Sequence, residues 1–198
     1  EKTFEEVLDE HPVSIQVNGQ WQTFPNAKAA EEASYEEYKA NLRRNAKNFR
    51  ITDEHLGEGG PKAKFQANVN AIRLLKELEA AGQQASPEQQ EVLSRYVGWG
   101  GLSDAFDPEK PAWALEYAQL KELLTPEEYA AARGSTLNAH YTSPTVIRAI
   151  YETVGRMGFE TGNILEPSCG VGNFFGMLPE EMRNSRLYGV ELDPVSGR

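Results

Sequence analysis

The chain has 198 residues, of which 39% are hydrophobic and 25% charged, and this predicts one or two ordinary folded domains. No signal peptide and no apolar run of membrane-spanning length is visible, so we expect a soluble, cytoplasmic protein without a membrane partner. The single cysteine excludes an internal disulfide, and three scattered histidines predict no metal site. The net charge of −10 argues against strong binding of duplex DNA over the whole surface, because phosphate backbones attract clustered lysines and arginines.

The first fifty residues (1–50) are predicted to form a hairpin followed by a linker helix. Apolar and polar residues alternate over residues 13–17, and Asn18-Gly19 favours the positive dihedral angles of a tight turn before a return strand to Phe24. Asn26 is the expected N-cap of an alanine- and glutamate-rich helix that runs to about Asn48.

The end of this helix carries a basic cluster that contains no carboxylate, made of Lys39, Arg43, Arg44, Lys47 and Arg50. At helical spacing, Arg43, Lys47 and Arg50 share one face. The cluster forms either a local contact to DNA phosphates or a solvated helix face that balances the acidic turn before it. We favour the solvated face, because charge runs mostly serve solvation.

Residues 51–135 are predicted to form a helical domain. Apolar residues recur three and four apart between Lys62 and Ala81, and Gly82 ends that helix. The runs Ser86-Pro87-Glu88-Gln89 and Thr125-Pro126-Glu127-Glu128 each start a helix with a capping hydroxyl and a proline. For the first of these helices, the expected buried positions are Leu93, Tyr96 and Val97. An amphipathic helix is expected between the two, with the buried positions Trp113, Tyr117, Leu120 and Leu124.

A glycine-rich stretch, Tyr96-Val97-Gly98-Trp99-Gly100-Gly101, interrupts the helical pattern. It lacks the Lys-Ser/Thr pair of a phosphate-binding P-loop, so it does not support nucleotide hydrolysis. Trp99 either stacks on a base or on the adenine of a cofactor, or it plugs the helical layer against the following domain. We favour the plug.

Residues 136–198 contain a strand, a glycine-containing turn and a helix between Asn163 and Phe175. Gly170 and Gly172 would let a ligand approach the main chain, and the helix start would present free N–H groups to it. The next strand, residues 187–193, brings Glu191 about twenty residues after the first glycine, the spacing of a carboxylate that binds ribose hydroxyls. A nicotinamide or flavin site is disfavoured, because the third glycine of its fingerprint falls at Phe175. The alternative is a glycine-rich turn in another doubly wound fold.

Three further residues of this region have local interpretations. Ser143 is the expected cap and Pro144 the first residue of a helix whose buried positions are Val146, Ile147 and Ile150. Cys169 lies inside the glycine turn without a base partner, which indicates a small loop-lining residue and not a nucleophile. For His140 we favour a hydrogen-bonded loop histidine over a general base.

The run Glu166-Pro167-Ser168-Cys169-Gly170-Val171-Gly172-Asn173-Phe174 resembles motif I of the adenine-specific, amino-group DNA methyltransferases, and His140-Tyr141-Thr142-Ser143-Pro144 resembles their motif X. This resemblance implies an α/β fold in which a helical layer precedes the first half, about two strands, of a Rossmann-type S-adenosylmethionine-dependent domain. It also implies the cofactor-binding residues Tyr141, Thr142, Glu166, Pro167, Ser168, Gly170, Gly172, Asn173, Phe174, Glu191 and Asp193.

The resemblance gives several of these residues a role. It implies that Glu166 holds the methionine end of S-adenosyl-L-methionine and that Thr142 and neighbouring N–H groups contact the cofactor carboxylate. Gly170 and Gly172 would line the cofactor, Glu191 would bind the ribose, and Asp193 would help at the adenosine side.

A wider likeness covers about residues 49–198. The stretch with Asn68, Asn70 and the glycine-rich run at 96–101 is similar to large methylase–helicase fusion proteins of bacterial mobile elements. In those proteins a methyltransferase domain is followed by a Swi/Snf-type helicase region.

The Asn/Asp-Pro-Pro-Tyr/Phe motif, with which this family aligns the adenine amino group and stacks on the flipped base, is absent. Because the chain also begins at Glu1, we expect a truncated piece that has no catalytic residue and is inactive alone, with DNA bound mainly by a missing region. An unpaired sheet edge would favour self-association. The alternatives are a non-catalytic DNA-processing or anti-restriction scaffold, and a methyltransferase that acts on RNA or protein.

Overall fold

The computed structural model describes residues 12–17, 19–45 and 49–198, and for residues 38–45 only the backbone. The chain divides into two compact units, residues 1–47 and 48–198, which are described separately below. No helix in the described ranges is long and apolar enough to cross a membrane. The predicted division of the larger unit at residue 135 stays a prediction.

The smaller unit contains the predicted hairpin and helix. Strands β1 (Val13–Val17) and β2 (Gln20–Phe24) pair in antiparallel register, with Val17 opposite Gln20, and α2 (Ala27–Asn45) follows. The predicted cap is confirmed, because the Asn26 Oδ1 accepts a hydrogen bond from the Ala29 N–H at 2.9 Å. Asn18 and the predicted helix end at Asn48 lie outside the described residues.

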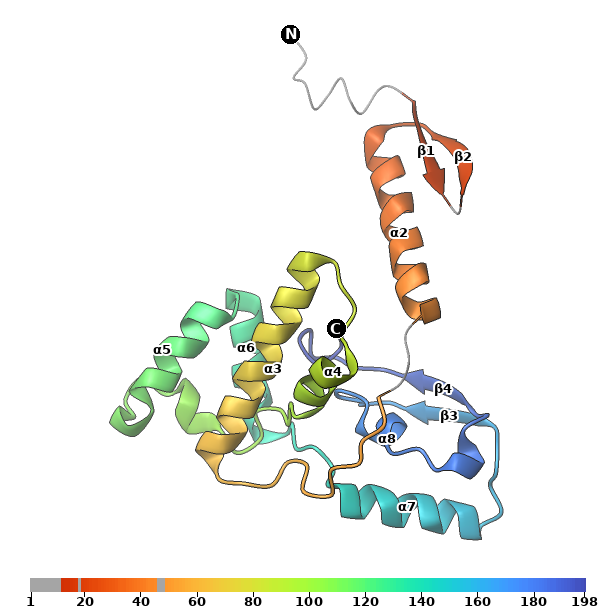
Figure 1. Cartoon of the computed structure of the whole chain (residues 1–198). Helices are drawn as coiled ribbons and strands as arrows, with labels where there is room; N and C mark the ends of the chain where they lie inside the picture. The colour runs from red at the N-terminus through yellow and green to blue at the C-terminus, as the bar shows by residue number, and fades with distance from the viewer. Residues whose placement is uncertain (1–11, 18, 46–48) are drawn as a thin grey trace. The chain divides into compact units, whose positions relative to one another are not determined.

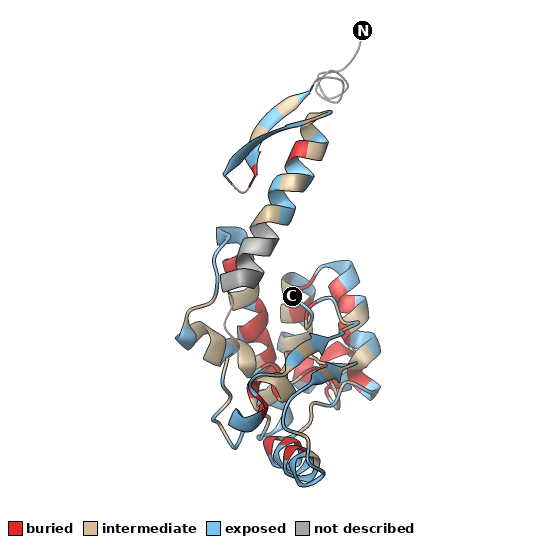
Figure 2. Ribbon diagram, turned by 90° about the vertical axis from the view of Figure 1, so that its right-hand side faces the viewer, coloured by how far each residue is buried: buried red, intermediate tan, exposed pale blue. Residues whose placement is uncertain are grey.

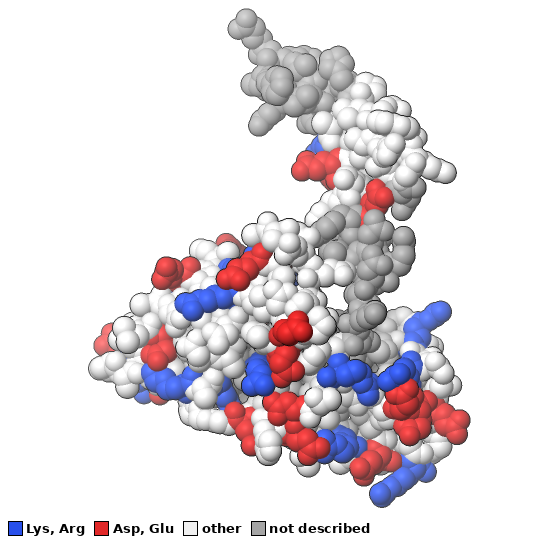
Figure 3. All heavy atoms as spheres, in the orientation of Figure 1, with Lys and Arg blue, Asp and Glu red and all other residues white. Residues whose placement is uncertain are grey.

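The basic cluster is described only in part. The side chains of Lys39, Arg43, Arg44 and Lys47 lie outside the described residues. Arg50 donates a hydrogen bond to the Leu178 carbonyl at 2.5 Å, so it has a structural partner. On the face of the larger unit drawn in Figure 3, lysines and arginines alternate with acidic side chains and do not gather in one basic patch.

The helical part of the larger unit surrounds its longest helix. Helix α3 (Pro61–Ala81) contacts both α4 (Pro87–Ser94) and α5 (Ala114–Leu123), which lie on opposite sides of it in Figure 1, and α6 (Pro126–Gly134) packs against α5. Both predicted capping boxes are confirmed at Ser86 and Thr125. Since α4 already ends at Ser94, the prediction that Tyr96 and Val97 belong to its buried face is wrong. Both residues follow the helix, in the glycine-rich run.

Aromatic side chains fill the core of this helical part, which appears in Figure 2 as a concentration of buried residues. Trp99 is 1% exposed and makes edge-on contacts with Phe65, Tyr96 and Phe106 at ring-centroid distances of 6.0, 6.3 and 5.3 Å. Such contacts add to the stabilisation from burial. Trp99 is therefore buried in the helical core, and its ring is not available to stack on a ligand. Its role as a plug against a following domain stays a prediction.

A second layer is built on two short parallel strands, β3 (Asn163–Glu166) and β4 (Arg186–Gly189). Ile164 and Leu187, opposite each other in register, pack with Ile147 of α7 (Pro144–Arg156) in a second core. The next pair, Leu165 and Tyr188, stays 62% and 44% exposed. The strand predicted over 187–193 is shorter than expected, because β4 ends at Gly189.

Helix α7 corrects two sequence-based predictions. Ser143 occupies the N-cap position, but its side chain makes no capping hydrogen bond. Of the positions expected to be buried, Ile147 is fully buried, whereas Val146 and Ile150 are 49% and 42% exposed. The stripe that faces the second core consists of Ile147, Tyr151 and Val154, and Val146 and Ile150 lie about one helical step away from it.

Candidate functional site

A cavity of about 630 Å³ lies where the chain leaves β3 and β4, between the glycine turn and the segment that precedes α7. This volume is typical of small-molecule sites. We call it the loop cavity. Nine of the residues predicted to bind cofactor line it: Tyr141, Thr142, Glu166, Ser168, Gly170, Asn173, Phe174, Glu191 and Asp193. Of the other two, Gly172 lines a neighbouring cavity of about 490 Å³ against α3 and α4, and Pro167 lines neither of these two cavities in the described part of the chain.

Tyr141 lies between two glycines from different parts of the chain. A Cβ atom added to Gly170 would stand 2.7 Å from the Tyr141 Cε1, and one added to Gly98 would stand 2.6 Å from its Cε2. Both glycines have positive φ angles, +54° and +70°, which other residues rarely adopt. The expectation that Gly170 is bare to let a ligand approach stays a prediction, and the structure adds a second reason for a glycine at this position. Its missing side chain makes room for the Tyr141 ring.

The Tyr141 hydroxyl starts a short chain of hydrogen bonds. It donates to the Ser196 Oγ at 3.1 Å, and the Ser196 hydroxyl donates to the Asp193 Oδ1 at 2.9 Å. Burial raises the pKa of the Tyr141 phenol well above its ordinary value, so the hydroxyl stays neutral and can donate. The ring also meets Tyr96 edge-on at 5.9 Å, which connects the cavity to the aromatic core.

The glycine-rich run at 96–101 packs against the segment that leads to Tyr141 and is hydrogen-bonded to it. The Gly100 N–H donates to the Ala139 carbonyl at 3.0 Å, and the Gly101 N–H donates to the Thr136 carbonyl at 3.0 Å. A Cβ on Gly100 would collide with that Ala139 carbonyl. Sequence reasoning missed this role, although three glycines within four positions signalled a close approach of two backbones.

Asn68 of α3 is hydrogen-bonded to the same run. It is fully buried, its Nδ2 donates to the Gly98 carbonyl at 2.6 Å and its Oδ1 accepts from the Val97 N–H at 2.9 Å. A buried amide with both ends bonded fixes the loop without an unpaired polar group. In the sequence, Asn68 stood out only through the wider family likeness.

Glu191 lies against the glycine turn. Its Oε2 accepts a hydrogen bond from the Gly170 N–H at 2.7 Å, and its Oε1 accepts from the Asp193 N–H at 2.8 Å. The predicted proximity of the first glycine and the acid is therefore present, although Glu191 follows the end of β4. A carboxylate has about four acceptor positions, so each oxygen of Glu191 keeps capacity for another donor.

The other predicted acids have different surroundings. Asp193 shapes the following turn, since its Oδ1 accepts from the Val195 N–H at 3.0 Å and from the Ser196 N–H at 2.7 Å. It lines the loop cavity, but this oxygen is already used by the protein. The Glu166 carboxylate accepts only a long hydrogen bond, 3.4 Å, from the Ser168 N–H among the bonds of the described residues. Its carboxylate is thus much less occupied than that of Asp193.

The Cys169 side chain agrees with its interpretation as a loop-lining residue that is not a nucleophile. Burial, and then the Glu191 charge, raise the pKa of the Cys169 thiol, so it stays protonated and is a poor nucleophile. The helix after the turn, α8 (Asn173–Gly176), is only one turn long, so the expected helix start with free N–H groups is much reduced. His140 lines the cavity, with its Nδ1 next to Gly100, and its interpretation as a hydrogen-bonded loop histidine stays a prediction.

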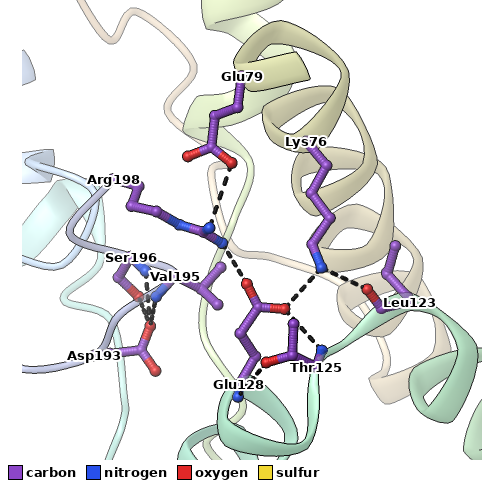
Figure 4. A network of polar contacts seen from close by, with 9 residues as sticks. All are labelled: Lys76, Glu79, Leu123, Thr125, Glu128, Asp193, Val195, Ser196 and Arg198. Carbon is purple, nitrogen blue, oxygen red and sulfur yellow. Dashed lines mark hydrogen bonds and ion pairs between the residues drawn. The ribbon is translucent and has the colours of Figure 1, made fainter. Parts of the chain in front are cut away.

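The turn at 193–198 is anchored to the helical part by an ion-pair network (Figure 4). Arg198 contacts Glu128 at 2.6 Å and Glu79 at 3.3 Å, and Lys76 contacts the other Glu128 oxygen at 2.7 Å. The Glu128 side chain is 9% exposed and also accepts from the Thr125 N–H, as its capping-box role predicts. Glu128 therefore joins α3, α6 and the turn that bears Asp193.

The Glu128 carboxyl has a lowered pKa. Burial alone would raise it, but the hydrogen bond from Lys76, the N–H of Thr125 and the hydrogen bond from Arg198 together outweigh burial. A lowered pKa in the folded state means that the ionised form stabilises the fold. This contribution is present above the unfolded pKa of about 4.3 and is lost as the pH falls through the folded value.

Comparison with known proteins gives two partial matches. Over 56 residues, 28% of this chain and 14% of the relative, the chain is 41% identical to Type II methyltransferase M.CvrRI of Paramecium bursaria Chlorella virus XZ-6E. Over 142 residues, 72% of this chain and 5% of the relative, it is 25% identical to Defense against restriction protein B of Escherichia phage P1. The chain thus spans a small part of either protein, and the first match supports a methyltransferase relationship. No family model and no solved structure matches.

The Tyr141 arrangement predicts the effect of an alanine at Gly170. Gly170→Ala should lower the free energy of unfolding by about 3 kcal/mol, because the methyl group meets the Tyr141 ring and the backbone is left-handed. Gly158→Ala, also at positive φ but with open space around its Cβ, should cost only about 1 kcal/mol. Urea unfolding measures both. In a Tyr141→Ala background, the loss of unfolding free energy caused by Gly170→Ala should fall to that caused by Gly158→Ala. An unchanged loss would contradict a steric conflict with the Tyr141 ring.

The Glu128 network predicts a pH-dependent stability. Glu128→Gln should destabilise the chain by about 2 kcal/mol at pH 7, less than a fully buried pair would, because Lys76 and Arg198 remain 30% and 37% exposed. Glu127→Gln, on the exposed side of the same helix, should change stability by less than about 0.5 kcal/mol. The difference between wild type and Glu128→Gln should shrink as the pH is lowered below about 4. A constant difference from pH 7 to pH 3 would exclude the ion pairs as its source.

Proposed function

We propose that this chain is the S-adenosyl-L-methionine-binding part of a methyltransferase that modifies the exocyclic amino group of adenine in DNA. The partial likeness to a type II methyltransferase supports the methyltransferase class. The Rossmann-type architecture, the choice of adenine and a methylase–helicase arrangement in the whole protein rest on the resemblance of the two motifs and of the 96–101 run.

One observation carries the proposal: the Glu191 carboxylate and the Gly170 N–H are joined by a 2.7 Å hydrogen bond at the wall of one cavity. Both oxygens of Glu191 are held by backbone N–H groups and keep acceptor capacity for further donors. Two neighbouring acceptors suit the two vicinal hydroxyls of a ribose. The acid is thereby oriented before any ligand arrives.

The remaining residues of the loop cavity fit the other end of the same ligand. The Glu166 carboxylate, with little hydrogen bonding of its own, would attract the positively charged methionine end, and Thr142 lines the same cavity from the segment before α7. When bound, S-adenosyl-L-methionine supplies an activated methyl group on its sulfonium. The protein's contribution is to bind and orient, since methyl transfer needs above all the alignment of two groups.

A second candidate function is a non-catalytic scaffold that acts against restriction. The match to Defense against restriction protein B favours it, because that match extends over 72% of the chain, far more than the methyltransferase match. The absence of an Asn/Asp-Pro-Pro-aromatic motif from these residues fits a scaffold equally well. A methyltransferase acting on RNA or protein would use the same cavity.

The sheet suggests how partners would bind. Leu165 of β3 and Tyr188 of β4 are 62% and 44% exposed, and Val190, which follows β4, is 57% exposed. The two strands thus present an apolar face, and within the described residues their outer edges have no strand partner. Such edges favour pairing with another strand. Self-association through this edge, and DNA binding mainly through a region other than these residues, remain proposals.

Cofactor binding tests the proposed function directly. Isothermal titration calorimetry of the chain with S-adenosyl-L-methionine should give one site, and Glu191→Gln should weaken it at least tenfold, because a charged acceptor is lost and an amide donor faces backbone N–H groups. Glu160→Gln, an exposed acid outside the cavity, should bind as the wild type does. Failure of the wild-type chain to bind the cofactor would refute the proposal.

Methyl transfer separates the chain's binding role from catalysis. These 198 residues, incubated with S-adenosyl-L-methionine and either duplex or single-stranded DNA, should transfer no methyl group, because the aligning Asn/Asp-Pro-Pro-aromatic motif is absent. Transfer of radiolabelled methyl to DNA is the measurement. Turnover by these residues would contradict this expectation and would rule out the scaffold.

A further inference from the structure

Two side chains anchor the turn at 193–198 to the helical part of the larger unit. Val195 is 6% exposed and packs into the aromatic core. The Arg198 guanidinium lies between Glu79 of α3, at 3.3 Å, and Glu128 of α6, at 2.6 Å (Figure 4). A partly exposed ion pair adds little to stability by itself. Two acidic partners from different helices, however, fix where the end of the turn lies.

The end of the turn that Arg198 anchors lies beside Glu191. A Cβ atom added to Gly197 would stand 3.6 Å from the Glu191 Cβ and 3.7 Å from its Cγ, so the Gly197 main chain lies next to the stem of the acid. The Gly197 N–H donates to the Asp193 carbonyl at 3.1 Å, which closes the turn. Arg198 follows Gly197 directly and lines the cavity of about 490 Å³ together with Glu191. The place of Arg198 therefore determines how the turn meets Glu191.

The same turn supplies one of the two backbone donors that orient Glu191. The Asp193 N–H donates to the Glu191 Oε1 at 2.8 Å, and the Gly170 N–H, from the glycine turn, donates to Oε2 at 2.7 Å. A turn released from α3 and α6 would carry the Asp193 N–H away and leave the carboxylate with a single backbone donor. A ligand would then have to order the acid on binding, and this ordering lowers the affinity.

We propose that Arg198 is a positioning residue, which presets the Glu191 carboxylate for its ligand by holding the 193–198 turn against α3 and α6. It acts through Glu191 and not by contact with the ligand. Through this link the helical part, which contains no residue of the two motifs, sets the affinity of the loop cavity. The inference rests on the proposed function, because Glu191 is there the acid that binds the ribose of S-adenosyl-L-methionine.

Amide hydrogen exchange of the full chain, followed by NMR, tests the positioning without a ligand. In Arg198→Gln, the Gly170 and Asp193 N–H groups should exchange about tenfold faster, because the carboxylate that accepts from them is no longer held in place. Amides within α3 should exchange as in the wild type. Arg198→Lys keeps the positive charge, so its exchange at both positions should stay within about threefold of the wild type.

Calorimetry with S-adenosyl-L-methionine measures the consequence for binding. The apparent dissociation constant rises by the inverse of the fraction of molecules in the competent conformation, so a turn that is docked in about one molecule in ten weakens binding about tenfold. Arg198→Gln should show this loss, and Arg198→Lys should recover most of it. In a Glu191→Gln background, Arg198→Gln should weaken binding much less, because both changes act through the same carboxylate.

Arg156→Gln is the matched control. It removes an exposed ion pair with Glu152, within α7 and away from both cavities, so exchange and affinity should stay as in the wild type.

Unchanged exchange at Gly170 and Asp193, exchange that rises equally throughout α3, unchanged affinity or full additivity with Glu191→Gln would each overturn the role of Arg198 and leave the proposed function standing. Failure of the wild type to bind S-adenosyl-L-methionine would overturn the proposed function instead. The exchange comparison would then still decide whether Arg198 orients Glu191.

Discussion

The site depends on one steric constraint: the Tyr141 ring occupies the space that Cβ atoms would fill at both Gly98 and Gly170. Gly98 comes from the run that closes the helical core, and Gly170 comes from the turn after β3. A ring gripped between two bare backbones sets their separation, because protein interiors are close-packed and tolerate little extra volume. The helical part and the glycine turn are therefore positioned by one side chain.

Hydrogen bonds and ion pairs fix the segments on both sides of the Tyr141 ring. Asn68 and the Gly100 and Gly101 N–H groups fix the 96–101 run against the segment before α7. On the far side, the turn after Glu191 is tied to α3 and α6 through Arg198 and Glu128, and Val195 packs into the helical core. The helical part is thus more than a preceding layer, because it builds one wall of the loop cavity and holds the turn that forms another.

Local sequence patterns predicted the helix caps and the hairpin, because these features depend on residues close together in the chain. The capping boxes at Ser86 and Thr125, the cap at Asn26 and the hairpin register follow from hydrogen bonds within a few residues. The wrong predictions concern positions whose burial is determined by segments far away in the sequence. Val146 and Ile150 are apolar yet exposed, because the second core meets the stripe with Ile147 instead. The contact of Gly170 with Tyr141, a residue 29 positions earlier, was likewise not visible in the sequence. The likeness to motifs I and X predicted nine residues that line one cavity. Gly98, Gly100 and Asn68 stood out through the wider family likeness, which gave them no structural role.

The carboxylates of the loop cavity differ in how far the protein itself already hydrogen-bonds them. Glu191 and Asp193 are held by backbone N–H groups, so their orientation is set in the free protein, and a ligand that meets them loses little free energy to ordering. The Glu166 carboxylate, in contrast, keeps acceptors that the described part of the protein hardly uses. The wall of the cavity therefore combines acids that the fold has already oriented with a carboxylate whose acceptors are almost free. Under the proposed function, Glu191 would meet the ribose hydroxyls and Glu166 the positive charge of the same ligand.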